Sequence, residues 1–278
     1  MKTSTSLFLI TVCSLMINCS SDDELLAVPT AETPTGGEKP QTEDPLIIPF
    51  EPTAPTTAQE IPGYPKSIRK YHNGGLIYWA YYYFRSDGKL LQITYGYEDP
   101  PNEIFTNIYH YDSEGKLIKL EGHDVYDYHW ENDRIVMVEA YNAMWFGHSR
   151  TTFQYDDKGQ IIEVETLYLD FEAGYQVAYS YYDSGNLETI KHYGKNDKDE
   201  YQISSRTSFA EYIDGENLFL DIEIIPGVLF SQQLPTLIDY QYYPFSEYNF
   251  IENYKYRFNN GKLTERTSQN TKVVYEYY

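Results

Sequence analysis

The chain has 278 residues, with 42 acidic against 21 basic side chains and a formal net charge of −21. Nucleic acid and anionic lipid surfaces would be repelled by such a charge, so neither is expected as a partner. The composition changes sharply along the chain, because none of the 31 tyrosines lies in the first sixty residues. The N-terminal region is therefore interpreted separately from the remainder.

The N-terminus has the features of an export signal. Lys2 precedes an apolar run from Leu7 to Ile17, which is shorter than the roughly 20 residues that span a bilayer. Cys19 follows this run and precedes the polar stretch SSDDE, and it resembles the lipid-attachment cysteine of bacterial lipoproteins. Met16 and Asn18 depart from the usual residues of that signal. The alternative is an ordinary secretory signal.

The stretch CSSDDE resembles the acidic tag of Bacteroidetes surface lipoproteins. This resemblance implies a signal peptide over residues 1–18, a lipid on Cys19 and membrane attachment through that lipid. It also implies an outer-membrane protein that faces the cell exterior, with a periplasm-facing protein as the alternative. Both cysteines, Cys13 and Cys19, lie in this region, so neither a disulfide nor a thiolate metal site is expected downstream.

Residues 19–60 are rich in proline, threonine and acidic side chains. Such a composition buries too little apolar surface to offset the entropy of ordering, so an acidic, disordered tether is expected. The apolar stretch LIIPF, Leu46 to Phe50, either docks on the following domain or remains a hydrophobic patch in the tether.

Residues 61–278 contain a repeated phrase of alternating aromatic residues, a polar turn with glycine and an apolar run. The turn residues are Gly88, Gly115, Gly159, Gly185 and Gly261, with Asp133 in place of glycine in a further copy. The aromatic residues assigned to the position before each turn are Phe84, Tyr111, Trp130, Tyr155, Tyr182 and Phe258. A recurrence near 26 residues indicates an array of similar units, each long enough for two strands and two turns.

Each phrase predicts a strand, a tight turn and a second strand. Glycine supplies the left-handed conformation of a short hairpin loop, and an aspartate before it can accept the amides of the turn. The third and fifth residues after each turn are expected to share the buried face. These pairs are Leu91 and Ile93, Ile118 and Leu120, Val136 and Val138, and Ile162 and Val164.

The expected fold is all-β: an antiparallel meander of repeated β-hairpins that forms a twisted open sheet, a sandwich or a partly closed barrel. Tyr212 to Phe230 is expected to be a degenerate hairpin, and the final KVVYEYY a closing strand. The phrases resemble the tyrosine-aspartate (YD) repeats of Rhs-type proteins, most closely at Tyr111-Asp112, Tyr155-Asp156 and Tyr182-Asp183. The resemblance implies architecture only, because a fold does not dictate a function.

No motif for a nucleophile, a phosphate loop or a cofactor is present, so no catalytic residue, cofactor or metal site is predicted. The histidines are interpreted as strand residues rather than zinc ligands. The candidate ligand-binding residues are Trp79, Trp145 and Phe146, because flat rings on a sheet can stack on sugars or anchor a protein.

The sequence therefore predicts a non-catalytic binding or adhesion protein of the cell surface, directed at a glycan or an envelope protein. One alternative is a carbohydrate-active hydrolase with its site in the divergent region 194–250. The other is a purely structural envelope protein.

Overall fold

The computed structural model describes residues 52–278 apart from 98–102, 143–146, 172, 196–199 and 216–232. These residues form one sheet of seventeen strands and a single turn of 3-10 helix, η1, and contain no α-helix. The all-β antiparallel meander expected from the sequence is confirmed. The strands are β1 (Pro65–His72), β2 (Gly75–Phe84), β3 (Leu90–Tyr97), β4 (Ile104–Tyr111), β5 (Leu117–Glu121), β6 (Val125–Glu131), β7 (Arg134–Asn142), β8 (Gly147–Tyr155), β9 (Ile161–Tyr168), β10 (Ala173–Tyr181), β11 (Leu187–Lys195), β12 (Tyr201–Ile213), β13 (Leu234–Tyr242), β14 (Phe250–Asn253), β15 (Lys255–Asn259), β16 (Lys262–Thr267) and β17 (Thr271–Tyr277), with η1 at Ser246–Tyr248.

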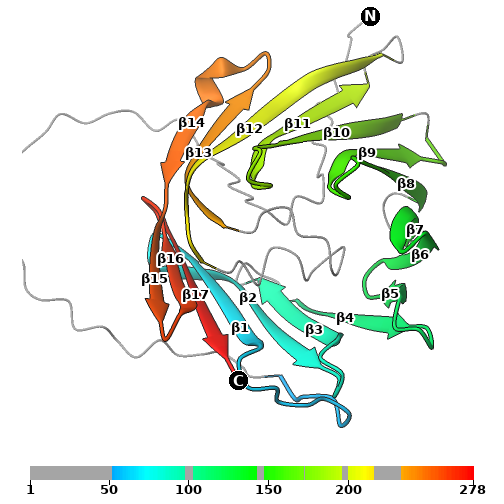
Figure 1. Cartoon of the computed structure of the whole chain (residues 1–278), viewed down its shortest axis with the longest axis vertical. Coiled ribbons are helices and arrows are strands. Elements are labelled where there is room, and N and C mark those ends of the chain that lie inside the picture. Colours follow the sequence, from blue (N-terminus) through cyan, green and yellow to red (C-terminus); the bar gives the residue numbers. More distant parts are fainter. Residues whose placement is uncertain (1–51, 98–102, 143–146, 172, 196–199, 216–232) are drawn as a thin grey trace, which may run out of the picture. The chain divides into compact units, whose positions relative to one another are not determined.

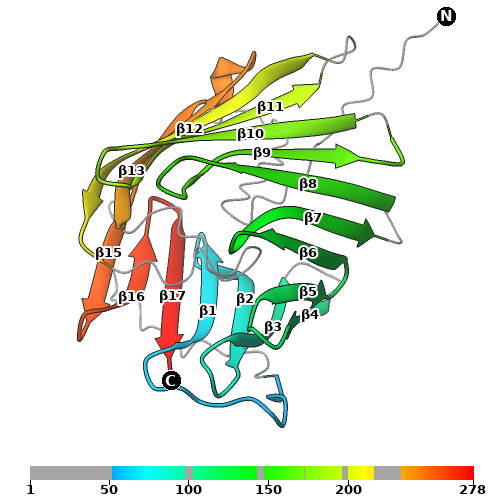
Figure 2. The same ribbon diagram turned by 45° about the vertical axis from the view of Figure 1, so that its right-hand side comes forward.

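Every strand pairs antiparallel with its neighbour in the chain from β1 to β14, and again from β15 to β17 (Figure 1). The last strand, β17, pairs with β1, so the closing role expected for KVVYEYY is confirmed. Figure 2 shows β17 beside β1 from a second direction.

One continuous segment joins the two ends of this ladder. Only Tyr254 separates β14, which pairs with β13, from β15, which pairs with β16. The amide of Tyr254 donates to Thr236 O at 2.7 Å, and the Tyr256 hydroxyl donates to Pro235 O at 2.5 Å, so the contact with β13 continues past the end of β14. The sheet is therefore a nearly closed, barrel-like meander.

The hairpin turns adopt the predicted geometry. The turn glycines have φ between +78° and +85°, and Asp133 has φ of 61°, which confirms it as the substitute for glycine. Asp112 Oδ1 accepts the amides of Glu114 at 2.9 Å and Lys116 at 2.8 Å, and Asp156 Oδ1 accepts the amide of Gln160 at 2.8 Å. The aspartate therefore holds the turn closed, as expected.

A β-bulge follows each of these turns and corrects the expected buried face. Phe84 pairs with Leu90 but Tyr83 pairs with Gln92, so Leu91 is an extra residue in β3. The same shift leaves Ile118, Val136, Ile162 and Thr264 unpaired in their strands. A bulge interrupts the alternation of faces, so residues three apart share a face there.

The expectation that the third and fifth residues after the turn share the core was therefore wrong for the third. The buried residues are the second and the fifth: Leu90 with Ile93, Leu117 with Leu120, Ile135 with Val138, and Ile161 with Val164. Of the bulge residues, Ile118 and Ile162 are exposed. The core cluster contains these aliphatic pairs together with Tyr82, Tyr109, Tyr128 and Phe153 from the strands before the turns.

One aromatic assignment also needs correction. The turn that contains Gly185 begins at Tyr182, whose amide donates to Asn186 O at 2.9 Å, as Asp156 donates to Gln160 O in its own turn. Tyr181 is therefore the last strand residue and pairs with Leu187 beside the bulge. The residue before this turn is Tyr181 rather than Tyr182. The position of the turn is fixed by the glycine, and the Tyr-Asp pair lies one residue later in this copy than in the others.

Aromatic side chains also connect successive hairpins. The ladder between β7 and β8 stops at Met137 and Thr152, and beyond it the Tyr155 hydroxyl donates to Ile135 O at 2.7 Å. Equivalent inter-hairpin bonds run from Tyr111 to Leu90 O, Trp130 to Leu117 O, Tyr181 to Ile161 O and Tyr277 to Leu263 O. Each of these bonds pairs a backbone carbonyl that lies beyond the end of the ladder with the neighbouring strand, so the side chain takes the place of a backbone donor.

The domain begins before residue 61, the boundary expected from the sequence. The Tyr83 hydroxyl donates to Pro52 O at 2.9 Å, and the Gln59 amide donates to Phe84 O at 2.8 Å. Residues 52–60 therefore belong with the sheet. The predicted tether otherwise lies outside the described residues, as does Cys19. Among the described residues, no helix is long and apolar enough to cross a membrane.

Candidate functional site

Of the aromatic residues proposed from the sequence, only Trp79 lies among the described residues. Trp79 is buried, with 8% of its surface exposed, and packs with Tyr81, Tyr83, Ala58 and Leu76. Its ring also lies against Gly96, where an added Cβ would come within 2.7 Å of the indole. Trp79 therefore packs within the sheet and does not present a ring to a ligand. Trp145 and Phe146 lie outside the described residues.

Exposed aromatic side chains gather instead where β13 turns into β14. We call this region the aromatic corner and define it as Tyr242, Tyr243, Phe245, Tyr248 and Ile251. Phe245 is 52% exposed and Tyr248 is 61% exposed, and their ring centroids lie 6.3 Å apart with the rings edge to face. Large exposed apolar side chains grouped in this way are typical of a binding surface.

The corner is held by backbone bonds rather than by burial of its rings. The Tyr242 amide donates to Asn249 Oδ1 at 2.7 Å, and the Tyr243 amide donates to Ser204 O on β12 at 2.9 Å. Within the turn, η1 is closed by bonds from the Tyr248 amide to Phe245 O and from the Asn249 amide to Ser246 O, each at 3.1 Å. The rings are therefore presented on a fixed backbone, which lowers the entropy lost when a ligand binds.

The sequence explains why the chain turns here. Pro244 cannot donate to a ladder and ends β13, while Asn249 supplies a side-chain acceptor that bridges the turn. Residues 242–251 contain one charged side chain, Glu247. The corner is therefore an aromatic and nearly neutral surface on a strongly acidic protein.

The sequence reasoning missed this surface, although a signal was present. The run YYPFSEYNF, residues 242–250, is aromatic without the alternation of a strand and contains a proline. Such rings cannot all face one side of a sheet, so several must be exposed. The run lies within the divergent region, where only a hydrolase was considered.

Two histidines converge on one carboxylate at the face of β6, β7 and β8. Glu139 lies 3.4 Å from His129 Nε2 and 3.7 Å from His148 Nε2, and it accepts a bond from Arg150 at 3.1 Å. The hydrogen bond from Arg150 is the main cause that lowers the pKa of Glu139. Because the guanidinium already neutralises this carboxylate, the cluster is an ion-pair network of the sheet surface. In the part of the chain that the structure describes, no group of three or more metal-ligating side chains is present.

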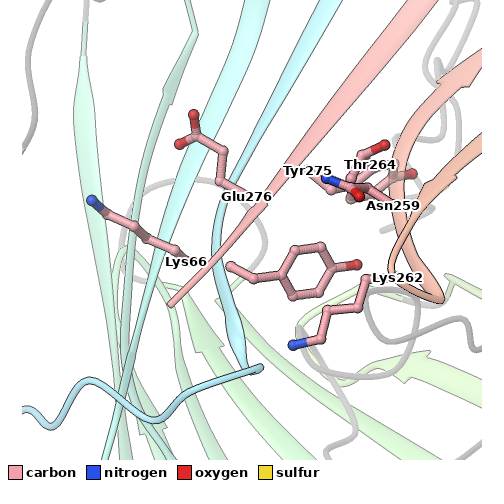
Figure 3. Close-up of a pocket in the computed structure, with 7 residues that line it drawn as sticks. Lys66, Asn259, Lys262, Thr264, Tyr275 and Glu276 are labelled. Atoms are coloured by element: carbon pink, nitrogen blue, oxygen red, sulfur yellow. The ribbon is translucent and has the colours of Figure 1, made fainter.

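Two grooves lie near the hairpin turns, where adjacent strands separate. One, of about 460 Å³, is lined by Lys66, Asn259, Lys262, Thr264, Tyr275, Glu276 and Tyr277 (Figure 3). The other, of about 390 Å³, is lined by Glu131, Asn132, Arg134, Val136 and Tyr155. Each contains one carboxylate, so neither offers the pair of carboxylates that glycoside hydrolysis requires.

Comparison with known proteins identifies the fold but no family. No protein-family model and no curated protein matches the chain. A porin-like protein from Bacteroides uniformis has a similar structure, with a TM-score of 0.52 and 11% identity over 80% of this chain and all of that one. A porin-like protein from Bacteroides vulgatus has a TM-score of 0.45 and 13% identity over 77% of this chain and 98% of that one.

The TcdB2-TccC3 complex is a further structural neighbour, with a TM-score of 0.34 and 12% identity over 69% of this chain and 10% of that one. Similarity to the Bacteroides uniformis protein indicates a shared fold alone, because the sequence identity is low. The other two similarities are too weak to add to it.

Proposed function

We propose that this protein is a non-catalytic lipoprotein of the outer membrane that faces the cell exterior and binds a neutral glycan through the aromatic corner. The observation that carries the proposal is the group of exposed rings on a hydrogen-bonded turn, centred on Phe245 and Tyr248. Aromatic faces pack on the C–H groups of sugar rings, and tyrosine hydroxyls can bond to sugar hydroxyls.

The charge of the corner favours a neutral glycan over a protein as the ligand. With a net charge of −21, the chain repels acidic polymers, while the corner itself carries only Glu247. Hot spots for proteins combine aromatic residues with arginine, and residues 242–251 contain no arginine. Polar side chains beside the rings, such as Gln241, which accepts from the Tyr243 hydroxyl at 3.0 Å, suit a ligand rich in hydroxyl groups.

The envelope location is supported by two observations. The N-terminal signal with Cys19 resembles that of surface lipoproteins. The protein from Bacteroides uniformis that shares the fold is described as porin-like, and porins belong to the outer membrane. A Cys19→Ser variant tests the anchor, because it should lose incorporated palmitate and leave the membrane fraction.

Orientation is tested by adding protease to intact cells that express the wild-type protein. An anchored protein that faces the exterior is degraded, whereas a periplasm-facing protein is protected until the outer membrane is permeabilised.

A glycan array probed with the full-length chain in detergent tests the binding function. The expected result is a signal on neutral glycans that falls when Phe245 or Tyr248 is replaced by alanine and survives Tyr97→Ala. Tyr97 is a suitable control because it is also exposed but lies on β3. No signal on any glycan would contradict the proposal and favour a structural role. Capture of an envelope protein that depends on the same two residues would instead assign the corner to a protein partner.

A further inference from the structure

An arginine lies among tyrosines on the face of the sheet that carries the core. Arg266 on β16 pairs with Tyr256 on β15 and with Val273 on β17, and directly paired residues share a face. Figure 2 shows these three strands side by side. The guanidinium carbon lies 5.1 Å from the Tyr254 ring centroid. We define the tyrosine cage as Arg266 with its four electrostatic neighbours, Tyr240, Tyr254, Tyr256 and Tyr275.

The charge of Arg266 forms no ion pair with any carboxylate of the described residues. Glu265, its neighbour in the sequence, lies on the other face and pairs with Lys272 at 2.9 Å. Glu252 accepts the Tyr254 hydroxyl, and it accepts Ser268 Oγ at 2.8 Å. Taking a cation out of water is costly unless an anion compensates it, and the contact with the Tyr254 ring offers only partial compensation.

Two hydrogen-bond donors of the cage are buried and unpaired. They are the Nε of Arg266 and the hydroxyl of Tyr240, and the two side chains act on each other electrostatically. The Tyr254 hydroxyl lies close to Tyr240, but it donates to Glu252. Buried polar groups are nearly always paired in native proteins, so the two donors point to an acceptor that the chain itself does not supply.

A ligand can reach the guanidinium, because Arg266 as a whole is only partly buried. We propose that the tyrosine cage binds a monocarboxylate with an apolar body. The planar guanidinium matches a carboxylate, and the Tyr240 hydroxyl donates to the same group. The rings of the other three tyrosines pack on the apolar body.

The charge next to the cage selects a monovalent ligand. Glu252 lies close enough to Tyr240 to oppose the ionisation of its hydroxyl, so it also repels a second negative charge on a ligand. Phosphate and sulfate are therefore disfavoured. No residue of the cage belongs to the aromatic corner, so the proposal does not depend on the corner binding a glycan.

Isothermal titration of the full chain with benzoate tests the proposal, with benzamide as the uncharged molecule of similar shape. Benzoate should bind saturably, and benzamide at least tenfold more weakly. Arg266→Gln should weaken benzoate binding at least tenfold, because the charge-assisted bonds are lost. Arg206→Gln is the matched control and should bind as the wild type does. Arg206 also has a buried, unpaired Nε, but it lies on the opposite face, because its neighbour Thr207 pairs with Tyr240.

Tyr240→Phe keeps the proposal testable if Arg266→Gln lowers the melting temperature. This substitution removes the unpaired hydroxyl and keeps the ring, so the free protein should melt at the wild-type temperature or above it. Benzoate binding should weaken about fivefold, because one hydrogen bond to the ligand is lost. Unchanged affinity for benzoate would contradict the role of the hydroxyl.

Four further outcomes would overturn the assignment. Benzamide that binds as tightly as benzoate would remove the role of the guanidinium. Inorganic phosphate that binds more tightly than benzoate would indicate a general anion site. Equal losses of affinity in Arg266→Gln and Arg206→Gln would exclude the cage as the place of binding. No saturable binding of benzoate would leave Arg266 as a structural cation held by the tyrosine rings.

Discussion

The hydroxyl of Tyr155 donates to the carbonyl oxygen of Ile135 at 2.7 Å, twenty residues earlier in the chain. The two residues come from adjacent hairpins, at a point where the strand ladder between β7 and β8 has ended. The same relationship recurs between Tyr181 and Ile161 O, also at 2.7 Å. The repeated tyrosine therefore has a definite structural role, because it joins each hairpin to the one before it.

Replacing Tyr155 by phenylalanine should remove one inter-hairpin bond without creating a cavity. The expected cost is about 1 kcal/mol of unfolding free energy, because the hydroxyl is lost and the Ile135 carbonyl is left unsatisfied. Urea unfolding measures it. Tyr141→Phe is the matched control, since the Tyr141 side chain is exposed, and it should stay within about 0.5 kcal/mol of wild type. Equal effects of the two substitutions would contradict the role assigned to the bond.

The neighbouring residues Ile161 and Ile162 test the bulge. Ile161 is fully buried, so Ile161→Ala should cost about 2–5 kcal/mol by leaving a cavity in the core. Ile162 is the extra residue of the bulge and is 37% exposed, so Ile162→Ala should cost less than about 1 kcal/mol. Thermal or urea unfolding of both variants distinguishes them. A larger loss of unfolding free energy for Ile162→Ala than for Ile161→Ala would contradict the bulge and would favour the regular alternation of buried residues that was expected from the sequence.

Buried tyrosines predict a loss of stability in alkali. Burial is the main cause that raises the pKa of Tyr111 to about 12, and burial raises the pKa values of Tyr128 and Tyr256 in the same direction. A raised pKa favours the protonated folded state. The stabilisation of the folded state by Tyr111 is fully present below the pKa of about 10 that tyrosine has in the unfolded chain, and it is lost as pH rises through about 12.

Urea unfolding midpoints across this pH range measure the loss, and Tyr111→Phe should reduce it. Ultraviolet absorbance of ionised tyrosine provides the independent readout. If the buried hydroxyls ionised near their ordinary pKa while the protein remained folded, the burial of these rings would be contradicted.

The sequence predicted the hairpin because its signals are local. Gly115 and Gly159 occupy positions with positive φ, and Asp112 and Asp156 accept turn amides, so each turn is specified within a few residues. The tyrosine stripe is likewise set by alternation along one strand. These features depend on no contact with a distant part of the chain.

The bulge and the register in which the last strand meets the first were not predictable from such local signals. The bulge residues Ile118 and Ile162 are themselves apolar, so the sequence has the same pattern of apolar and polar residues as a strand without a bulge. Closure depends on the pairing of Ser67 with Glu276, which are 209 residues apart. At Arg266 the repeat has a cation where others have an aliphatic residue, and its guanidinium lies 5.1 Å from the Tyr254 ring centroid. The cation at this position is explained by its contact with the Tyr254 ring, which the sequence alone does not show.

The residues of the aromatic corner were not among those predicted from the sequence. Exposed aromatic rings were expected to carry binding, and the residues chosen were Trp79, Trp145 and Phe146. Trp79 packs in the sheet because it lies on a central strand opposite Gly96, which leaves space for its ring. Phe245 and Tyr248 are exposed because they lie in a turn that no element covers among the described residues.

The affinity of the full chain for the neutral glycan that gives the strongest array signal tests the central claim most directly. Isothermal titration should show that the double variant Phe245→Ala, Tyr248→Ala binds at least tenfold more weakly, a loss of about 1.4 kcal/mol or more. Tyr97→Ala should bind as the wild type does. Unchanged affinity in the double variant, with its fold intact by circular dichroism, would show that the aromatic corner is not the binding surface.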